Sequence, residues 1–350
     1  MQPTLRLSLS ALLLLSPLSF STANELLSCV EVDCPTQGGS ADCRVANQTF
    51  TAVGLTSISI SKEIFEDQND DVELTWTVGL DHHDNVDPDD RYLRYIERVY
   101  YLGTPPTVDL TAENLEYGGC ALYMTKEGNK NIFHSNNVSP DSSPAFCHQN
   151  LGDDCISALD SKISSLAGEH RTSASEADIC SSIASSLQEN LPSSCTALLT
   201  SNSNNSLLVR GVPLTGSQAP SPLSEAQNSS SNCYPTLPKS NNLTRVFAYN
   251  ISASQFINET APAIQGETPI WSLFWSKSQS EDDNDDAQIE DPTVQMVCLR
   301  TIDRTTASEE TRADGGGAAA ASFLYGSSGA LSVWGTVVSV GTAMFSFGML

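Results

Sequence analysis

Residues 72–80 read VELTWTVGL, and the spacing of their apolar side chains decides the fold. Every second residue of the stretch is apolar: Val72, Leu74, Trp76, Val78 and Leu80. A period of two sends alternate side chains to opposite faces of a β-strand, so we expect these apolar residues to share one buried face. Trp76 is therefore predicted to pack in a core and not to serve as a platform for a ligand.

Further strands are predicted outward from this one, because other short stretches are rich in β-branched and aromatic residues and end at acidic or Pro-containing turns. They lie at residues 50–60, 95–103, 120–126, 244–253, 268–277 and 294–302. Strands thus stand both before and after the middle of the chain. This order predicts one β-sandwich that is interrupted by an insertion.

The insertion has the spacing of two helices. Apolar residues recur at intervals of three and four: Ile156, Leu159, Ile163 and Leu166, then Ile179, Ile183 and Leu187. Such spacing is typical of amphipathic helices. Asp153 or Asp154 can cap the first helix, and Gly168 can end it. We therefore expect a helical hairpin over residues 147–199.

The hairpin restricts which cysteines can pair. In an antiparallel hairpin Cys155 and Cys180 lie near opposite ends, and a helix of about 15 residues is roughly 22 Å long. A disulfide needs Cα atoms within about 7 Å, so a Cys155–Cys180 bond is not expected. Cys195, at the far end of the second helix, is the better partner for Cys155 or Cys147.

The chain has ten cysteines: Cys29, Cys34, Cys43, Cys120, Cys147, Cys155, Cys180, Cys195, Cys233 and Cys298. An even number at wide spacing suits five disulfides in an oxidising compartment. No CxxC pair occurs, so neither a zinc knuckle nor a thioredoxin-like site is indicated. For Cys298 we expect a partner in the N-terminal or linker segment.

The fold is therefore predicted to be mainly β: a disulfide-rich, β-sandwich-like ectodomain with a Cys-containing helical hairpin. The predicted segments follow in chain order. They are a signal peptide (1–23), a Cys-stapled N-terminal cap with the first β half (24–146), the helical hairpin insertion (147–199), a Ser/Asn/Pro-rich glycosylated linker (200–243), the second β half (244–303), a polar stalk (304–314) and a glycosylphosphatidylinositol (GPI) attachment signal with a removed hydrophobic tail (315–350).

The N-terminus has the order of features found in a secretory signal peptide. Arg6 supplies a positive charge, residues 7–20 are apolar, and Ser21, Thr22 and Ala23 put small side chains before the expected cleavage point. We predict cleavage after Ala23. The alternative is an uncleaved anchor.

The C-terminus has the order of a GPI attachment signal. Small residues at 314–317 are followed by an uncharged spacer at 318–328 and a moderately apolar tail at 329–350. Gly315 is the expected attachment residue, with Asp314, Gly316 and Gly317 as alternatives. A single transmembrane helix is the competing interpretation, but no Lys or Arg follows the tail to mark a cytosolic side.

Seven Asn-x-Ser/Thr sequons are candidate N-glycosylation sites: Asn47, Asn137, Asn204, Asn228, Asn242, Asn250 and Asn258. A chain that enters the secretory route meets the enzyme that modifies such sites, so we expect several of them to carry sugar.

Acidic residues dominate the charge of the chain. The formal net charge is −25 and the isoelectric point is about 4.3, which argues against a nucleic-acid partner. Asp81, His82, His83 and Asp84 combine carboxylates with imidazoles, which are ligands for zinc or copper, and carboxylates also bind calcium. The alternatives are a polar turn without metal and a cation-dependent adhesin. No other cofactor is expected.

No known catalytic motif occurs: HExxH, GxSxG and GxxxxGK[ST] are all missing from the sequence. Trp271 and Trp275 share one face of a predicted strand, where they form either a sugar-binding platform or part of the core. The chain is therefore expected to be non-enzymatic. The alternative is a carbohydrate-binding or carbohydrate-active wall protein that uses buried carboxylates or an aromatic platform.

The signal peptide, acidic Cys-stapled ectodomain, many sequons and anchor-type tail together resemble the GPI-anchored surface and cell-wall glycoproteins of filamentous fungi. The resemblance covers the two ends and the composition but no catalytic motif. It implies a location at the outer face of the plasma membrane or in the cell wall, with a structural, adhesion or recognition role. The implied partners are the membrane, through the lipid anchor, and wall polysaccharide or surface proteins.

Overall fold

The computed structural model describes residues 26–27, 29, 32, 34, 43–65, 70–84, 93–126, 146–170, 175–199, 207–254, 266–277 and 292–302. All of them belong to one compact unit, Met1–Gly315. The predicted signal peptide, polar stalk and anchor signal lie outside the described residues.

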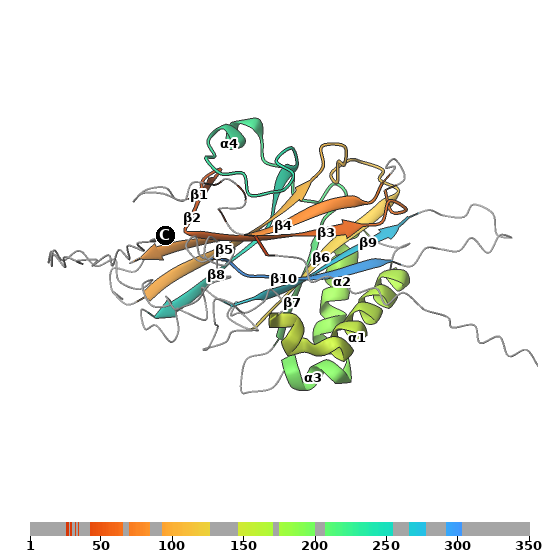
Figure 1. Cartoon of the computed structure of the whole chain (residues 1–350). Helices are drawn as coiled ribbons and strands as arrows, with labels where there is room; N and C mark the ends of the chain where they lie inside the picture. The colour runs from red at the N-terminus through yellow and green to blue at the C-terminus, as the bar shows by residue number, and fades with distance from the viewer. Residues whose placement is uncertain are drawn as a thin grey trace, which may run out of the picture. The chain divides into compact units, whose positions relative to one another are not determined.

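The predicted strands and helices occur in the predicted order along the chain, with α1 and α2 between the two groups of strands, and the structure adds β1, β2, α3, β7 and α4 (Figure 1). The elements are β1 (Cys43–Val45), β2 (Gln48–Phe50), β3 (Ala52–Ile60), β4 (Val72–Asp84), β5 (Leu93–Thr104), β6 (Tyr117–Lys126), α1 (Phe146–His170), α2 (Glu176–Glu189), α3 (Ser193–Leu199), β7 (Leu207–Pro213), α4 (Glu225–Ser229), β8 (Asn242–Ser254), β9 (Thr268–Ser276) and β10 (Thr293–Leu299).

The strands form two four-stranded antiparallel sheets and one small hairpin. Sheet I has the order β3-β4-β5-β8, sheet II has the order β10-β9-β6-β7, and β1 pairs with β2. The predicted fold class, mainly β with a helical insertion and disulfides, is confirmed.

The core between the two sheets is built by the alternating residues of β4. Val72, Leu74, Trp76, Val78 and Leu80 all lie in one buried cluster with residues of β6, β9 and β10. The indole Nε1 of Trp76 donates a hydrogen bond to the hydroxyl oxygen of Ser272 in the opposite sheet, at 2.7 Å. The predictions for the apolar face of β4 and for Trp76 are therefore confirmed.

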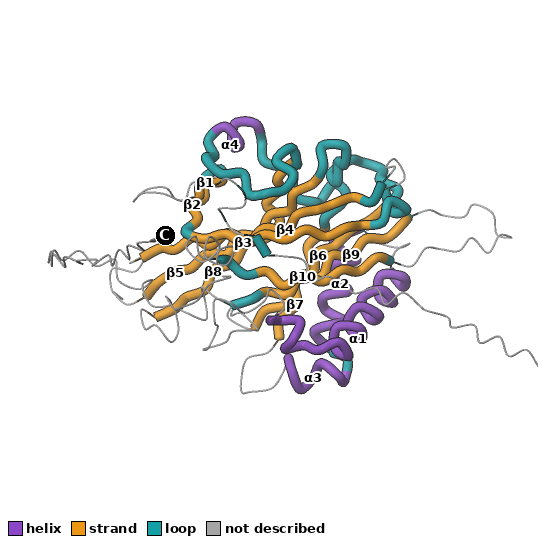
Figure 2. Tube along the Cα trace, in the orientation of Figure 1, coloured by secondary structure: helices purple, strands orange, loops and turns teal. Residues whose placement is uncertain are grey.

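The second face of sheet II lies under the three helices α1, α2 and α3, which gather on that side of the sheet (Figure 2). The shared cluster includes Cys120, Leu122, Trp271, Leu273 and Trp275 from the strands. Gly211 of β7 permits a close approach of α2, because a Cβ there would stand 2.0 Å from the carbonyl oxygen of Cys180. The insertion is thus a third layer on the sandwich.

The second face of sheet I is also covered, although the sequence predicts polar residues there. Thr75 and Thr77 of β4 are fully buried. Their hydroxyls donate to the backbone carbonyls of Leu237 and Pro235, at 2.5 and 2.6 Å. Residues 214–241, which include α4, form this cover together with the N-terminal cap, which is residues 26–27, 29, 32 and 34 with β1–β2. Threonine suits the position because its hydroxyl remains hydrogen-bonded when buried.

Two predicted boundaries differ from the structure. The predicted linker contains β7, which pairs with β6, and the 214–241 segment that covers sheet I. β4 extends four residues past Leu80, because residues Asp81 to Asp84 still pair with β5. In both cases the partner strand supplies the backbone hydrogen bonds, which a local sequence pattern does not report.

The helical insertion also differs in detail. α1 contains a non-helical Gly152 (φ 71°, ψ 156°) close to the predicted caps and continues through Gly168 to His170. α2 is capped by Ser175, whose side chain accepts from the amide of Asp178. A third helix, α3, follows α2 and carries Cys195.

The end of the described chain is fixed to sheet I. Ile302 bridges to Val53 of β3, and its amide donates to the Val53 carbonyl at 3.0 Å. A Cβ at Gly54 would stand 1.8 Å from the carbonyl oxygen of Arg300. Glycine therefore lets the chain that leaves sheet II lie directly on β3.

Candidate functional site

The predicted metal ligands do not form a turn. Asp81, His82, His83 and Asp84 all lie in β4, where Asp81 pairs with Glu97 and Asp84 with Arg94 of β5. Asp81 is buried, and the side chains of the other three lie outside what the structure describes. The prediction of a polar turn is therefore wrong, because the backbone of these four residues continues as a strand. The metal prediction stays a prediction.

Two other groups of metal-type ligand atoms come together in the described part of the chain. They are Cys34 with Cys43 and Cys233, and Cys147 with Glu267 and Cys298. Cys147 and Cys298 form a disulfide. A disulfide sulfur is not a thiolate, so the second group is not a metal site.

Trp271 and Trp275 do not form a surface platform. Both are fully buried between sheet II and the helices. The indole Nε1 of Trp271 donates to Oδ1 of Asp160 in α1 at 2.9 Å. Burial raises the pKa of Asp160, while the hydrogen bond from Trp271 and the nearby His148 act against that rise. The two tryptophans therefore hold helices on a sheet.

Three disulfides involve the helices, two to strands of sheet II and one between α1 and α3. Cys120 of β6 bonds Cys180 of α2, Cys147 of α1 bonds Cys298 of β10, and Cys155 of α1 bonds Cys195 of α3. Cys155 therefore pairs with Cys195 and not with Cys180, as the hairpin geometry predicts. The expected partner of Cys298 is wrong, since its partner lies in the helical insertion.

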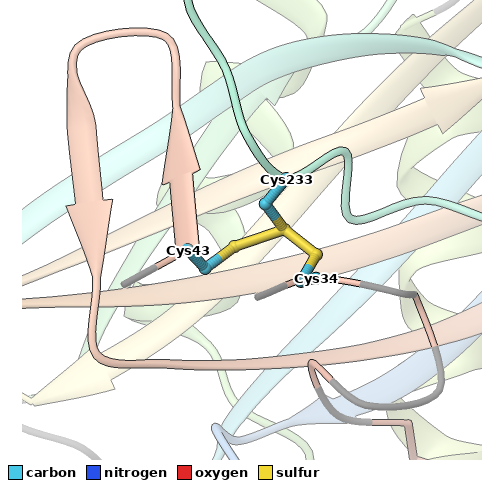
Figure 3. Close-up of side chains that lie close together, drawn as sticks. All are labelled: Cys34, Cys43 and Cys233. Atoms are coloured by element: carbon cyan, nitrogen blue, oxygen red, sulfur yellow. A yellow bond between two sulfur atoms is a disulfide. The ribbon is translucent and has the colours of Figure 1, made fainter. Parts of the chain in front are cut away.

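Three further cysteines, Cys34, Cys43 and Cys233, come together on the face of sheet I that points away from sheet II (Figure 3). Cys233 lies within disulfide range of both Cys34 and Cys43, with Cα–Cα distances of 4.8 and 5.3 Å. A sulfur makes only one disulfide, so Cys233 joins one of the two at a time. Either bond ties the N-terminal cap to the 214–241 segment.

A buried carboxyl group lies where α1, β9 and β10 meet. Glu267 is 2% exposed, and its Oε2 accepts from the amide of Cys147 at 2.5 Å. The Nε of Arg300 lies 3.8 Å from Oε1. Burial raises the pKa of Glu267 to about 7, against the lowering effects of Arg300, the Cys147 amide and Arg98. No sequence pattern marks this residue, because its partners come from distant segments.

The arrangement of Glu267 suits a structural role. Its carboxyl group binds one of the first amides of α1, which have no partner inside the helix. A negative charge at a helix N-terminus is also favourable. A raised carboxyl pKa is found in catalytic acids as well, but those stand in clefts that admit substrate. Glu267 does not line the cleft described next.

A cleft of about 320 Å³ opens beside the start of β8. The end of β5, the loop 105–111 and the 214–222 stretch supply leucine, valine and proline side chains to its walls. Its polar lining residues are Thr104, Asp109, Thr111, Asn242 and Thr244. Oδ1 of Asp109 accepts from the amide and hydroxyl of Thr111, at 3.0 and 2.8 Å. Only Asn242 is marked in the sequence, as a sequon.

The described sequons differ in exposure. Asn47 and Asn250 are exposed, whereas Asn228 of α4 and Asn242 of β8 are half-buried. Asn137, Asn204, Asn258 and the predicted attachment residue Gly315 lie outside the described residues.

No family model, curated protein or solved structure matches the chain. Among the described residues, no helix has the length and apolar character needed to cross a membrane.

Proposed function

We propose that the protein is a secreted, N-glycosylated surface or cell-wall protein, held by a GPI anchor, with a structural, adhesion or recognition role. Its ectodomain is the sandwich with its helical layer. Its partners are the membrane, through the lipid, and wall polysaccharide or other surface proteins.

The observation that carries the proposal is the set of disulfides between distant segments. The bonds Cys120–Cys180, Cys147–Cys298 and Cys155–Cys195 span 60, 151 and 40 residues. Bonds of this kind form and persist in oxidising compartments and are rare in the cytosol. They support entry into the secretory route, for which residues 1–23 supply a signal-type segment.

The buried tryptophans support a structural or recognition role over carbohydrate binding. A sugar platform needs an aromatic face that is open to solvent, and Trp271 and Trp275 are fully buried. Glu267, the buried carboxyl group with a pKa of about 7, binds the start of α1. Neither feature offers a surface to a polysaccharide.

The anchoring proposal is tested on the full chain expressed in a eukaryotic host. A phospholipase C specific for inositol anchors is expected to release the protein from membranes, and the mature mass is expected to lack residues after the attachment site. Protein that stays membrane-bound and includes Leu350 in its mass would contradict the anchor and support a transmembrane span.

The role is tested with the released protein. Binding is measured against a panel of insoluble wall polysaccharides and against intact walls stripped of protein. We expect retention on intact walls without selective binding to one soluble oligosaccharide. Saturable binding to one oligosaccharide, or its cleavage, would favour a carbohydrate-active protein.

A further inference from the structure

The cleft beside β8 contains a glycosylation sequon in its wall. Asn242 is the first residue of β8 and pairs with Thr104 of β5. Asn242 and Thr244 both line the cleft, as expected for alternate residues of a strand. Thr244 is 8% exposed, so the sequon faces a recess and not open solvent.

Asn250 provides the contrast on the same strand. It pairs with Glu97 of β5 and is exposed. Asn47, between β1 and β2, is exposed too. A sugar on either residue extends directly into water, whereas a sugar on the half-buried Asn242 begins at the cleft that its side chain lines.

We propose that the cleft holds the first N-acetylglucosamine of an N-glycan on Asn242, so that this sugar is packed as part of the fold. The proposal rests on the proposed function, because the sugar is added only in the secretory route.

The attachment is a transfer from a lipid-linked oligosaccharide diphosphate. The bond between the anomeric carbon and the diphosphate oxygen breaks, and the diphosphate leaves with the bonding electrons. A carbon–nitrogen bond forms to Nδ2 of Asn242, and that nitrogen loses one proton. The transfer occurs before β8 pairs with β5, while the sequon is accessible.

The cleft has the size and chemistry for a sugar ring. Its volume of about 320 Å³ lies at the lower end of the range for ligand sites, which is about 300–1,000 Å³. Pro106, Pro220 and Pro222 offer apolar surface to a ring face or an acetyl methyl group. Thr104 and Asp109 place a hydroxyl and a carboxylate among them, which can bind sugar hydroxyls.

Backbone hydrogen bonds join the walls of the cleft to one another and to β8. The amide of Gly216 donates to the carbonyl of Leu110 at 3.0 Å, which joins the two loops. The amide of Leu223 donates to the carbonyl of Leu243 in β8 at 2.8 Å. A covalent tether also gives the sugar an effective concentration on the order of millimolar, so modest contacts suffice. Stacking on an aromatic ring is not required.

The first test compares glycan release at separate sites. Full-length protein from a glycosylating host is treated with peptide-N-glycosidase in heavy-oxygen water, first folded and then unfolded. Each released site becomes a labelled aspartate. In folded protein we expect release at Asn242 to be at least about tenfold slower than at Asn250 and Asn47, as for a locally protected site. Unfolding is expected to remove the difference.

The second test asks whether the sugar packs against the cleft. Thr244→Ala removes the sequon and keeps Asn242, Thr244→Ser keeps the sequon, and Asn250→Gln removes the exposed glycan. In Thr244→Ala, hydrogen exchange is expected to rise about tenfold at the Gly216 and Leu223 amides. Thr244→Ser and Asn250→Gln are expected to match the wild type.

The outcomes separate this inference from the proposed function. Equal release rates at Asn242 and Asn250, or unmodified Asn242 in protein glycosylated at Asn47 or Asn250, would overturn the cleft proposal alone. Exchange at Gly216 and Leu223 that does not respond to loss of the Asn242 glycan would do the same. A chain that passes through the host without sugar at any sequon would overturn both proposals.

Discussion

The two outer faces of the sandwich are covered in different ways. On sheet II, two disulfides tie α2 and α1 to strands, a third joins α1 to α3, and each cysteine has its own partner. On sheet I, the N-terminal cap and the 214–241 segment meet around Cys34, Cys43 and Cys233. The helical side is thus fixed at several separate points, and the cap side is fixed at one shared point.

The non-covalent contacts of the two covers also differ. The cap is joined to the 214–241 segment by polar contacts, such as Arg44 amide to Asn232 Oδ1 at 2.6 Å and Ala46 amide to Ser231 Oγ at 2.8 Å. The helices contact sheet II mainly through buried apolar side chains. Loss of one covalent link should therefore matter more on the helical side.

The largest effect is expected from the bond between α1 and β10. Replacing both Cys147 and Cys298 by serine reopens a 151-residue loop, which should lower the free energy of unfolding by about 5 kcal/mol. Guanidinium denaturation of protein made in an oxidising host measures the change. Ser157→Ala, on the exposed face of α1, is the control. A loss below about 1 kcal/mol would show that this bond does not constrain the helical side.

The second effect is a pH dependence of stability that arises from Glu267 at the start of α1. The pKa of Glu267 is raised from its ordinary value of 4.5 to about 7, so the folded state binds the proton more tightly than the unfolded state. The contribution of Glu267 to stability is therefore greatest below about pH 4.5 and is lost as the pH rises to about 7, by about 3 kcal/mol in total.

Glu267→Gln removes this titration and keeps an acceptor for the Cys147 amide. Denaturation at pH 5 and pH 8 is expected to show a much smaller difference in the variant than in the wild type. Glu189→Gln, at the exposed end of α2, is the control. Equal pH dependence in wild type and Glu267→Gln would contradict the assignment of the proton to Glu267.

The third effect separates packing from hydrogen bonding on the helical side. Trp271 and Trp275 are both fully buried, but only the Trp271 indole donates to an acceptor, Asp160, among the described residues. Trp271→Phe should therefore destabilise the protein more than Trp275→Phe, by about 1–2 kcal/mol. Thermal or chemical denaturation of the two variants gives the difference. Equal losses would mean that the hydrogen bond adds no net stability.

The smallest effect is expected on the cap side. Cys34 and Cys43 stand 199 and 190 residues from Cys233, so the loop entropies of the two bonds differ by less than about 0.1 kcal/mol. Cys34→Ser should leave a Cys43–Cys233 bond, Cys43→Ser a Cys34–Cys233 bond, and each should cost less than about 1 kcal/mol. Peptide mapping without reductant identifies the bonds. If either variant left Cys233 reduced, the two cysteines would not be equivalent partners.

Local patterns in the sequence predict the elements but not all of their neighbours. The period of two in β4 locates its core face, and the helical spacing in α1 and α2 locates the insertion, because both depend on nearby residues. The burial of Thr75 and Thr77 does not follow from that period, since the cover comes from residues 235 and 237. The sequence does not predict β7 for the same reason, because this short strand is stabilised by its pairing with the distant β6.

The disulfides and buried groups also divide into those that local spacing predicts and those that depend on distant segments. Hairpin geometry argues against Cys155–Cys180 and favours Cys195 as the partner of Cys155 or Cys147, because these cysteines belong to one local motif. The structure shows that the partner is Cys155. Cys147–Cys298 and the Glu267 junction depend on how α1 lies against sheet II, which no local spacing encodes. Asn242 is visible as a sequon, but the recess around it is formed by two loops more than a hundred residues apart.

The contact between Ile302 and β3 gives the folded unit a direction of mechanical resistance. Tension on the chain beyond Ile302 first loads the bridge to Val53 and pulls along the edge of sheet I. If that bridge opens, the force reaches Cys298, where the covalent bond to Cys147 passes it into α1. β10 therefore cannot be peeled from β9 past that point. A chain pulled at this end would carry load through its covalent framework.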